Sequence, residues 1–281
     1  MSRSNDQMSH NHQKKIAVIN DFCGFGRCSI AASLPIISAM KIQCCPLPTS
    51  IFSNHTGFES FYYTDYTEHM NIYMDEWKKL DLQFEGILTG FLGSPEQIGI
   101  VKRFLELFKT ENNITVIDPV MGDYGKLYPT YSPNLAEQMN SLVPYADILT
   151  PNLTEACILT GTEYHPDMNE NELFVLCSKL ADMGPNKIVI SGLERVDSLE
   201  NYIFEAGKTP QIILEHKVGP FRSGTGDVFS SIIAADAVNG VEFAASIRHA
   251  SSFIAKVLRR TLELDLPKTD GICFEEYLTE I

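Results

Sequence analysis

The 281-residue chain lacks the signals that would place it in several common functional classes. It has no Gly-x-x-x-x-Gly-Lys-Ser/Thr loop, which excludes the phosphate-binding loop of P-loop enzymes. It has no Gly-x-Ser-x-Gly turn, which excludes the nucleophile elbow of α/β-hydrolases. No apolar run approaches the roughly 20 residues of a membrane-spanning helix. We therefore expect a soluble, cytoplasmic protein that has no membrane partner.

Positive charge is also scarce. The chain has 22 Lys and Arg residues against 36 Asp and Glu residues, a formal net charge of −14, and no Lys/Arg cluster marks a nucleic-acid footprint. Because such a field repels a polyanion, we expect no nucleic-acid partner. A small anionic ligand must then be held by local groups, namely backbone amides, a metal ion and a few cations.

Cysteine is present but its pattern carries no chemistry of its own. The seven cysteines are scattered through apolar segments, with no C-x-x-C pair and no His at metal-ligand spacing, which predicts reduced cytosolic thiols. The first 13 residues are polar and lack the apolar stretch of a signal peptide. We expect residues 1–13 to form a disordered tail. Residues 14–281 are predicted to form a single domain, since no linker, repeat or change of composition divides them.

From residue 15 onward, short apolar runs alternate with longer amphipathic stretches. Helices are predicted from Ser29, as the cap, to near Met40, and from Ser94-Pro95, where Ser suits the N-cap and Pro the first helical position. This alternation predicts an α/β fold with a mainly parallel central sheet and helices on both faces. Polar residues, Gly or Pro follow nearly every strand, so ligands are expected at the carboxyl edge of the sheet. The predicted strands are 16–19, 44–49, 87–89, 115–117, 148–149, 187–190 and 211–214.

The strongest chemical signal is Gly224-Thr225-Gly226-Asp227, which directly precedes an apolar run. Two glycines around a hydroxyl residue let backbone N–H groups converge, and the following helix points its positive end at the same place. The motif is therefore an anion hole with a carboxylate beside it. Anion holes commonly hold phosphate, and a carboxylate there can take a proton from an attacking hydroxyl, which indicates phosphoryl transfer to an alcohol. Such Gly-rich turns are also common structural elements of α/β proteins.

Carboxylates follow two further predicted strands. Asp118 and Asp123 flank a glycine turn and suit a hydrated Mg²⁺, although Asp118 can equally form an Asx turn. Pro151 opens a helix for which Asn152 is a plausible N-cap. Glu155, one turn later, can join Asp118 around a metal or complete a capping box with Asn152. The local sequence does not decide between these alternatives.

Two loops near the first strands are candidate ligand sites. The polar stretch 53–57 contains His55 and Thr56 and can hold a small polar substrate, while a single His in such a loop is more commonly bonded within the loop. Gly24 and Gly26 do not complete a dinucleotide-binding fingerprint. Ser29 stands where the third glycine belongs, and no acidic residue is well placed after the second strand.

In this order and spacing, the motifs resemble those of the ribokinase-like superfamily, and more closely its pyridoxal (vitamin B6) kinase branch. The resemblance implies the three-layer ribokinase-like fold and ATP-dependent phosphorylation of the 5′-hydroxymethyl group of pyridoxal, pyridoxine or pyridoxamine in B6 salvage. It also implies Mg²⁺, with or without a monovalent cation such as K⁺, and a homodimer. The matching segments span nearly the whole chain and are Phe52–Gly57, Leu88–Gly90, Asp118–Asp123, Thr150–Glu155 and Gly224–Asp227.

The resemblance further implies roles for individual positions. Asp227 matches the catalytic base, and Gly224, Thr225 and Gly226 match the anion hole for the transferring phosphoryl group. Asp118 and Glu155 match positions around Mg²⁺ and its waters. The implied ATP-binding residues are Asp118, Asp123, Asn152, Glu155, Ser191 and Thr225. The implied substrate-binding residues are Asp21, Phe52, His55, Thr56 and Phe91.

The turn after the first strand departs from the Ser-His-containing turn of the well-known pyridoxal kinases. An Asp there, as at Asp21, is also similar to hydroxymethylpyrimidine kinases of thiamine synthesis, but those relatives often end the anion hole in Cys, where this chain has Asp227. Asp21 is predicted to contact the substrate ring, and the vitamer preference stays open. The alternatives are a hydroxymethylpyrimidine kinase and a non-catalytic B6- or nucleotide-binding protein. Arg222, just before the anion hole, either touches phosphate or is solvated.

Overall fold

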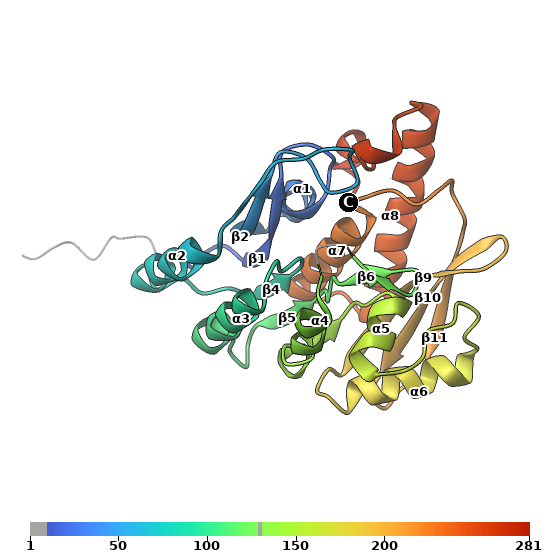
Figure 1. Ribbon diagram of the computed structural model, residues 1–281, viewed down its shortest axis with the longest axis horizontal. Helices are drawn as coiled ribbons and strands as arrows, with labels where there is room; N and C mark the ends of the chain where they lie inside the picture. The colour runs from blue at the N-terminus through green and yellow to red at the C-terminus, as the bar shows by residue number, and fades with distance from the viewer. Residues whose placement is uncertain (1–9, 129–130) are drawn as a thin grey trace, which may run out of the picture.

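The computed structural model describes residues 10–128 and 131–281, which build a central sheet between two helical layers (Figure 1). The sheet has nine strands in the order β11-β10-β9-β8-β5-β4-β1-β2-β3. A separate two-stranded sheet pairs β6 (Gly122–Asp123) with β7 (Lys126–Leu127). The strands of the large sheet are β1 (Lys15–Cys23), β2 (Gln43–Phe52), β3 (Tyr63–Asp65), β4 (Gly86–Thr89), β5 (Ile114–Ile117), β8 (Ile148–Leu149), β9 (Lys187–Glu194), β10 (Ser198–Glu205) and β11 (Gln211–His216).

The centre of the sheet is parallel and its edges are antiparallel. Strands β2, β1, β4, β5, β8 and β9 run in one direction, whereas β3 pairs antiparallel with β2, and β10 pairs antiparallel with both β9 and β11. All seven predicted strands are present. In the large sheet, β3 and β10 were not predicted, and they are the strands that reverse direction by antiparallel pairing. The two short strands β6 and β7 were not predicted either.

Helices cover both faces of the sheet, which confirms the predicted fold class (Figure 1). β1 shows why: Ala17 and Ile19 belong to one apolar cluster, while Ile16 and Val18 belong to another on the opposite face. Helices α1, α7 and α8 pack in the second cluster and α2 to α6 in the first. Their bounds are α1 (Ser29–Ala39), α2 (Thr67–Lys79), α3 (Pro95–Phe108), α4 (Pro133–Met139), α5 (Leu153–Thr160), α6 (Glu170–Ala181), α7 (Thr225–Asn239) and α8 (Phe243–Glu263).

Two helix starts test the predicted caps. At α3 the Ser94 hydroxyl accepts a hydrogen bond from Gln97 N at 3.3 Å, with Pro95 at the first position, as predicted. At α1 the prediction was wrong by one residue. Ser29 is the first helical residue, with a φ of 56°, and Cys28 occupies the N-cap without a side-chain hydrogen bond. The turn after β1 therefore leads directly into α1, and its first helical residue, Ser29, has a left-handed backbone conformation.

The predicted tail, residues 1–13, lies mostly outside the described residues, which begin at residue 10. Asn11, near its end, contacts the fold: its Nδ2 donates to Asp81 O at 2.9 Å, and its Oδ1 accepts from Gln83 N at 3.0 Å. Within the described part of the chain, no helix combines the length and apolar character that a membrane crossing requires.

Candidate active site

A cleft of about 630 Å³ follows the carboxyl ends of the parallel strands. Every position that the sequence assigned to catalysis, substrate, nucleotide or metal lines this cleft. The contributing segments come from the ends of β1, β2, β4, β5, β8 and β9 and from the start of α7. The structure thus brings together residues that are far apart in the chain, at the edge where open α/β sheets bind ligands. Their individual roles remain predictions.

Gly224 fixes the start of α7 against the loop that joins β1 to α1. Its φ is +84°, and a Cβ at this position would lie 2.0 Å from the carbonyl oxygen of Arg27, so only glycine fits. The first backbone bond of the helix is from Val228 N to Gly224 O at 3.0 Å. The amides of residues 225–227 precede that bond and have no backbone acceptor within the helix. The Asp227 amide donates to its own carboxylate, which leaves the amides of Thr225 and Gly226 available to an anion.

Gly226 differs from Gly224 in what surrounds it. A Cβ built on Gly226 would meet no described atom within 4 Å, and the residue is not at positive φ. Protein packing therefore does not require a glycine at this position. A bare Cα does leave the amide at the helix start open to close approach by a ligand.

Asp227, in the first turn of α7, is held by a residue that the sequence analysis missed. Asn20 donates from Nδ2 to Asp227 Oδ1 at 3.1 Å. Its own Oδ1 accepts from Asp21 N at 2.9 Å and from Phe91 N at 2.8 Å. A Cβ on Gly90 would lie 2.5 Å from the Asn20 amide, which explains the glycine before Phe91. The available signal was a polar residue at the end of an otherwise apolar strand.

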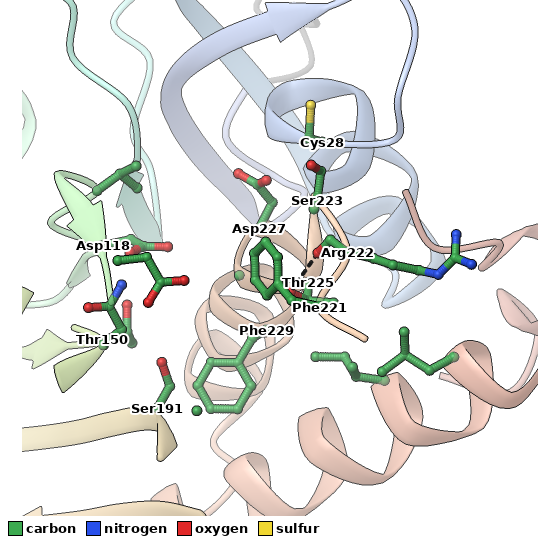
Figure 2. A pocket seen from close by; sticks show the side chains of 18 of the residues that line it. Cys28, Asp118, Thr150, Ser191, Phe221, Arg222, Ser223, Thr225, Asp227 and Phe229 are labelled. Atoms are coloured by element: carbon green, nitrogen blue, oxygen red, sulfur yellow. Dashed lines mark hydrogen bonds between the residues drawn. The ribbon is translucent and has the colours of Figure 1, made fainter. Parts of the chain in front are cut away.

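The cleft gathers buried carboxylates whose negative charges are close together. Burial raises the pKa of Asp227, while the Ser29 backbone N–H and the Asn20 amide oppose this shift. The pKa of Asp118 lies well above its usual range because the group is buried and because Glu155 and Asp227 repel its charge. Figure 2 shows Asp118 and Asp227 at the same cleft. Such a group of acids is stabilised by a cation.

Glu155 and Asn152 form the capping box that the sequence left as one of two alternatives. Asn152 Oδ1 accepts from Glu155 N at 3.0 Å, and Glu155 Oε2 accepts from Asn152 N at 2.8 Å. Glu155 Oε1 also accepts from Met121 N at 3.1 Å, and Asn152 Nδ2 donates to Gly122 O at 2.8 Å. The pair thus ties α5 to the turn that carries Asp118. Burial raises the pKa of Glu155 to about 8, against the effect of these backbone donors.

The residues predicted to hold a metal are carboxylates from two neighbouring turns of the cleft. In the described ranges, no three His, Cys, Asp or Glu side chains converge into a ready-made metal site. Mg²⁺, however, is commonly bound through one or two carboxylates, and water and phosphate oxygens complete its shell. The buried Asp118 with Glu155 nearby fits that pattern, because their mutual repulsion is relieved by a divalent cation.

A second part of the cleft is aromatic and contains Asp21. Asp21 is 6% exposed, and its Oδ2 accepts from the Cys23 thiol at 3.3 Å. Burial raises the pKa of Asp21 to about 6, opposed by the Ser29 hydroxyl. The Phe52 ring stacks on Tyr63 with centroids 5.2 Å apart and meets Phe91 edge-on at 6.2 Å. We call this part, lined by Asp21, Cys23, Cys28, Phe52 and Phe91, the ring pocket.

His55 and Thr56 line the cleft beside the ring pocket, but His55 uses both ring nitrogens on the backbone. Its Nε2 donates to Thr269 O at 2.7 Å, and its Nδ1 accepts from Gly57 N at 3.1 Å. These partners fix the Nε2–H tautomer, because a carbonyl only accepts and an amide N–H only donates. His55 therefore forms part of the wall and has no ring nitrogen left for a ligand. Thr56 has an exposed side chain at the same mouth.

The far end of the cleft holds Asp123 and Ser191, both predicted ATP-binding positions. Asp123 Oδ1 accepts from Tyr124 N at 2.8 Å, and Tyr124 donates its hydroxyl proton to Glu194 at 2.9 Å. Apolar side chains that the sequence analysis did not single out complete this end: Leu199, Phe229, Ile254, Ala255 and Leu258. Their apolar character is what a core also requires, so the sequence carries no separate signal for them.

Arg222 is neither solvated nor aimed at the anion hole. It is 4% exposed, and its guanidinium donates to Leu266 O at 2.8 Å and to Pro267 O at 2.7 Å. Figure 2 shows the side chain turned away from Asp227. Both alternatives predicted for Arg222, contact with phosphate and solvation, are therefore wrong, since a buried guanidinium must satisfy its donors within the protein.

Comparison with known proteins places the chain in a family. The phosphomethylpyrimidine kinase family model matches residues 26–270. The pyridoxal kinase of Arabidopsis thaliana is 31% identical over 231 residues, which cover 78% of this chain and 72% of that protein. The chain belongs to the pyridoxal kinase family. This confirms the resemblance inferred from the motifs, and members of the family are ATP-dependent phosphotransferases.

Solved structures of pyridoxal kinase relatives share the fold. A candidate phosphomethylpyrimidine kinase from Bacteroides thetaiotaomicron, in a crystal form with pyridoxal, has a TM-score of 0.91 and 35% identity, covering 95% of each chain. The pyridoxal kinase of Leishmania donovani, in complex with ADP and pyridoxamine, has a TM-score of 0.84 and 19% identity, covering 94% of each chain. At that lower identity the likeness shows the fold alone.

Proposed function

We propose that this protein transfers the γ-phosphoryl group of ATP to the 5′-hydroxymethyl group of pyridoxal, pyridoxine or pyridoxamine, with Asp227 as the general base. The observation that carries the proposal is the position of Asp227. It lies at the start of α7, beside amides that have no helical acceptor, and Asn20 joins it to the backbone of Asp21 and Phe91 in the ring pocket. A base at the boundary between an anion site and a ring pocket is what transfer to a ring-borne alcohol requires.

In this mechanism each group of the chain has one task. Asp227 accepts the proton of the substrate's hydroxymethyl group, and the hydroxymethyl oxygen bonds to the γ-phosphorus of ATP. The bond between the γ-phosphorus and the β–γ bridging oxygen breaks, which releases ADP. The amides of residues 225 and 226 stabilise the charge on the phosphoryl oxygens. Burial helps Asp227 to hold the proton it receives, because its pKa is raised above the usual value.

Asp118 would hold Mg²⁺ and its water shell, with Glu155 behind it, and the ion would neutralise the charge of the ATP phosphates. The support for this assignment is the buried carboxylate pair and its mutual repulsion. Asp123, Asn152, Ser191 and Thr225 are proposed to line the nucleotide side of the cleft. Asn152 acts there through the turn it holds, since its amide donates to Gly122 O.

The ring pocket is proposed to hold the vitamer between Asp21, Phe52 and Phe91, with His55 and Thr56 at its mouth. Aromatic walls suit a flat pyridine ring, and a buried carboxylate offers one polar anchor. The crystal form of the Bacteroides relative with pyridoxal supports a B6 ligand, and membership of the pyridoxal kinase family supports ATP as the phosphoryl donor.

Two further points belong to the proposal. The exposed edge strand β3 and the residues beside it present the apolar side chains of Ile51, Phe61, Tyr62 and Tyr63. This surface supports the predicted homodimer, which light scattering tests.

A hydroxymethylpyrimidine acceptor is the second candidate function, because the matching family model describes phosphomethylpyrimidine kinases.

The test is ATP consumption by the purified protein with Mg²⁺, offering pyridoxal, pyridoxine, pyridoxamine and hydroxymethylpyrimidine in parallel. The proposal predicts turnover with at least one B6 vitamer. Turnover with the pyrimidine alone would assign the second candidate function. Binding of pyridoxal and ADP without turnover of any acceptor would leave a non-catalytic binding protein.

A further inference from the structure

Residues 266–270, which follow α8, lie where three separate loops of the cleft meet. We call this segment the C-terminal strap. Four backbone carbonyls of the strap accept hydrogen bonds from side chains of three loops. Arg222 bonds the carbonyls of residues 266 and 267, His55 bonds that of residue 269, and Arg27 bonds that of residue 270. These bonds attach the strap to all three loops at once.

Arg222 joins the strap to the anion hole. Its guanidinium bonds Leu266 O and Pro267 O, and its own carbonyl accepts from the Thr225 hydroxyl at 3.2 Å. The Arg222 Nε has no hydrogen-bond partner in the described part of the chain. A buried cation that bonds only carbonyls is costly, and its two bonds hold the guanidinium in one orientation against the strap.

His55 joins the strap to the ring pocket. Its Nε2 donates to Thr269 O at 2.7 Å, and it belongs to the loop of residues 53–57 that lines the pocket mouth. The imidazole also packs on Gly26, where an added Cβ would lie 2.3 Å from the His55 ring. A shift of this loop therefore moves both the strap and the turn after β1.

Arg27 contacts both the strap and the anion hole. Its Nη1 donates to Asp270 O at 2.9 Å, and its Nε donates to Glu275 at 2.5 Å. Its carbonyl oxygen is the atom against which Gly224 packs. Arg27 thus touches the strap through its side chain and supports the anion hole through its backbone. The strap, the ring-pocket loop and the anion hole form one continuous contact path.

We propose that the C-terminal strap is a positioning element that couples the ring pocket to the anion hole, so that vitamer and nucleotide bind cooperatively. The inference rests on the proposed function. A vitamer that orders residues 53–57 fixes Thr269 through His55, and the strap then fixes the loop of residues 222–226 through Arg222. Because coupling between two sites is reciprocal, bound nucleotide must strengthen vitamer binding by the same factor.

The experiment measures the dissociation constant of ADP by calorimetry, with and without saturating pyridoxal. For the unaltered protein we expect pyridoxal to tighten ADP binding about fivefold or more. Arg222→Lys keeps the charge but cannot span two carbonyls, so it should reduce the factor toward one. His55→Ala should do the same, and His55→Gln, which retains a donor near Nε2, should restore part of it. The double variant of Arg222→Lys and His55→Ala should lose no more coupling than either single variant.

Arg260→Ala is the matched control. Arg260 also bonds acidic residues near the C-terminus, Glu276 and Glu263, but makes no bond to the strap among those the structure describes. Its removal should leave the coupling factor unchanged. If Arg222→Lys does not fold, the two His55 variants carry the test alone.

The inference is overturned if the unaltered protein shows no coupling, or if folded His55→Ala retains the full factor. The dissociation constants of ADP with and without pyridoxal do not depend on turnover. A protein that turns over a vitamer without coupling refutes the strap and leaves the proposed function intact. A protein that shows coupling but turns over no acceptor supports the strap and refutes the proposed reaction.

Discussion

Asn20 and Asp227 are separated by 207 positions in the sequence and are joined by a hydrogen bond of 3.1 Å from Asn20 Nδ2 to Asp227 Oδ1. The bond connects the first strand of the sheet to the helix that carries the proposed base. Because Asn20 Oδ1 accepts from two further backbone amides, its orientation is fixed and Nδ2 can point only toward Asp227. Asn20 is a positioning residue for the base.

Asn20→Asp should keep both accepted bonds and lose the donated one, placing a second carboxylate against Asp227. We expect kcat to fall about 100-fold, since the base is displaced and repelled. Steady-state kinetics with pyridoxal and far-UV circular dichroism measure this. Unchanged kcat in a folded variant would remove Asn20 from the positioning of Asp227.

The two glycines of the anion hole should respond in opposite ways to alanine. Gly224→Ala puts a Cβ into the Arg27 carbonyl at positive φ and should destabilise the fold by more than about 2 kcal/mol. Gly226→Ala meets no described atom and should leave the thermal midpoint equal or higher, while kcat falls because the methyl group stands at the open amide. Thermal melts and kinetics separate the two effects. Full activity in Gly226→Ala would argue against phosphate contact at this amide.

Asp21 should make stability depend on pH. Its folded pKa of about 6 lies above the unfolded value, so the folded state favours the protonated form. The stability that this protonation provides is fully present below about pH 4 and lost as pH rises through 6. Asp21→Asn should therefore raise the free energy of unfolding at pH 8 by on the order of a few kcal/mol, and by much less at pH 4. Thermal melts at the two pH values measure this as a higher midpoint at pH 8.

The same Asp21→Asn variant should bind pyridoxal more weakly while its affinity for ADP changes little, because Asp21 lies in the ring pocket. Calorimetry with each ligand provides the comparison. Equal losses for both ligands would show that Asp21 supports the cleft as a whole and does not contact the ring.

Asp118→Asn should raise the Mg²⁺ concentration needed for half-maximal rate about tenfold, because a carboxylate donor is replaced by a neutral amide. Asp75→Asn, which alters an exposed acid paired with Arg103, is the control and should not change the Mg²⁺ dependence. Chelation with EDTA should abolish turnover in both variants and in the parent. A Mg²⁺ requirement that is identical in Asp118→Asn would place the ion elsewhere.

Local sequence patterns predicted the central strands because each is a short apolar run buried on both faces of the sheet. The strand β10 was not predicted because Glu200 and Asn201 interrupt its apolar residues, and its pairing with β9 and β11 depends on partners that a local pattern does not contain. Ser29 was misplaced as a cap for a related reason. Its positive φ is imposed by the turn at the cleft and not by its own preference.

The site was predictable to the extent that its residues follow strand ends. All assigned positions line one cleft, because parallel strands bring their carboxyl ends to one edge. The bonding partners of Asn20 and Arg222 were not predictable in this way. Asn20 acts on a residue 207 positions away, and Arg222 is committed to the carbonyls of residues 266 and 267, which follow α8. Contacts of this kind depend on the complete fold.

The most direct test of the account is the rate of a single turnover by Asp227→Asn, measured with pyridoxal and Mg²⁺-ATP beside the unaltered protein. The substitution keeps the shape of the side chain and its capacity to accept the Asn20 bond, and it removes the base. We predict a rate at least about 100-fold lower, with dissociation constants for ADP and pyridoxal within about twofold of the parent. A single-turnover rate close to that of the unaltered protein would contradict the account, because phosphoryl transfer would then proceed without Asp227.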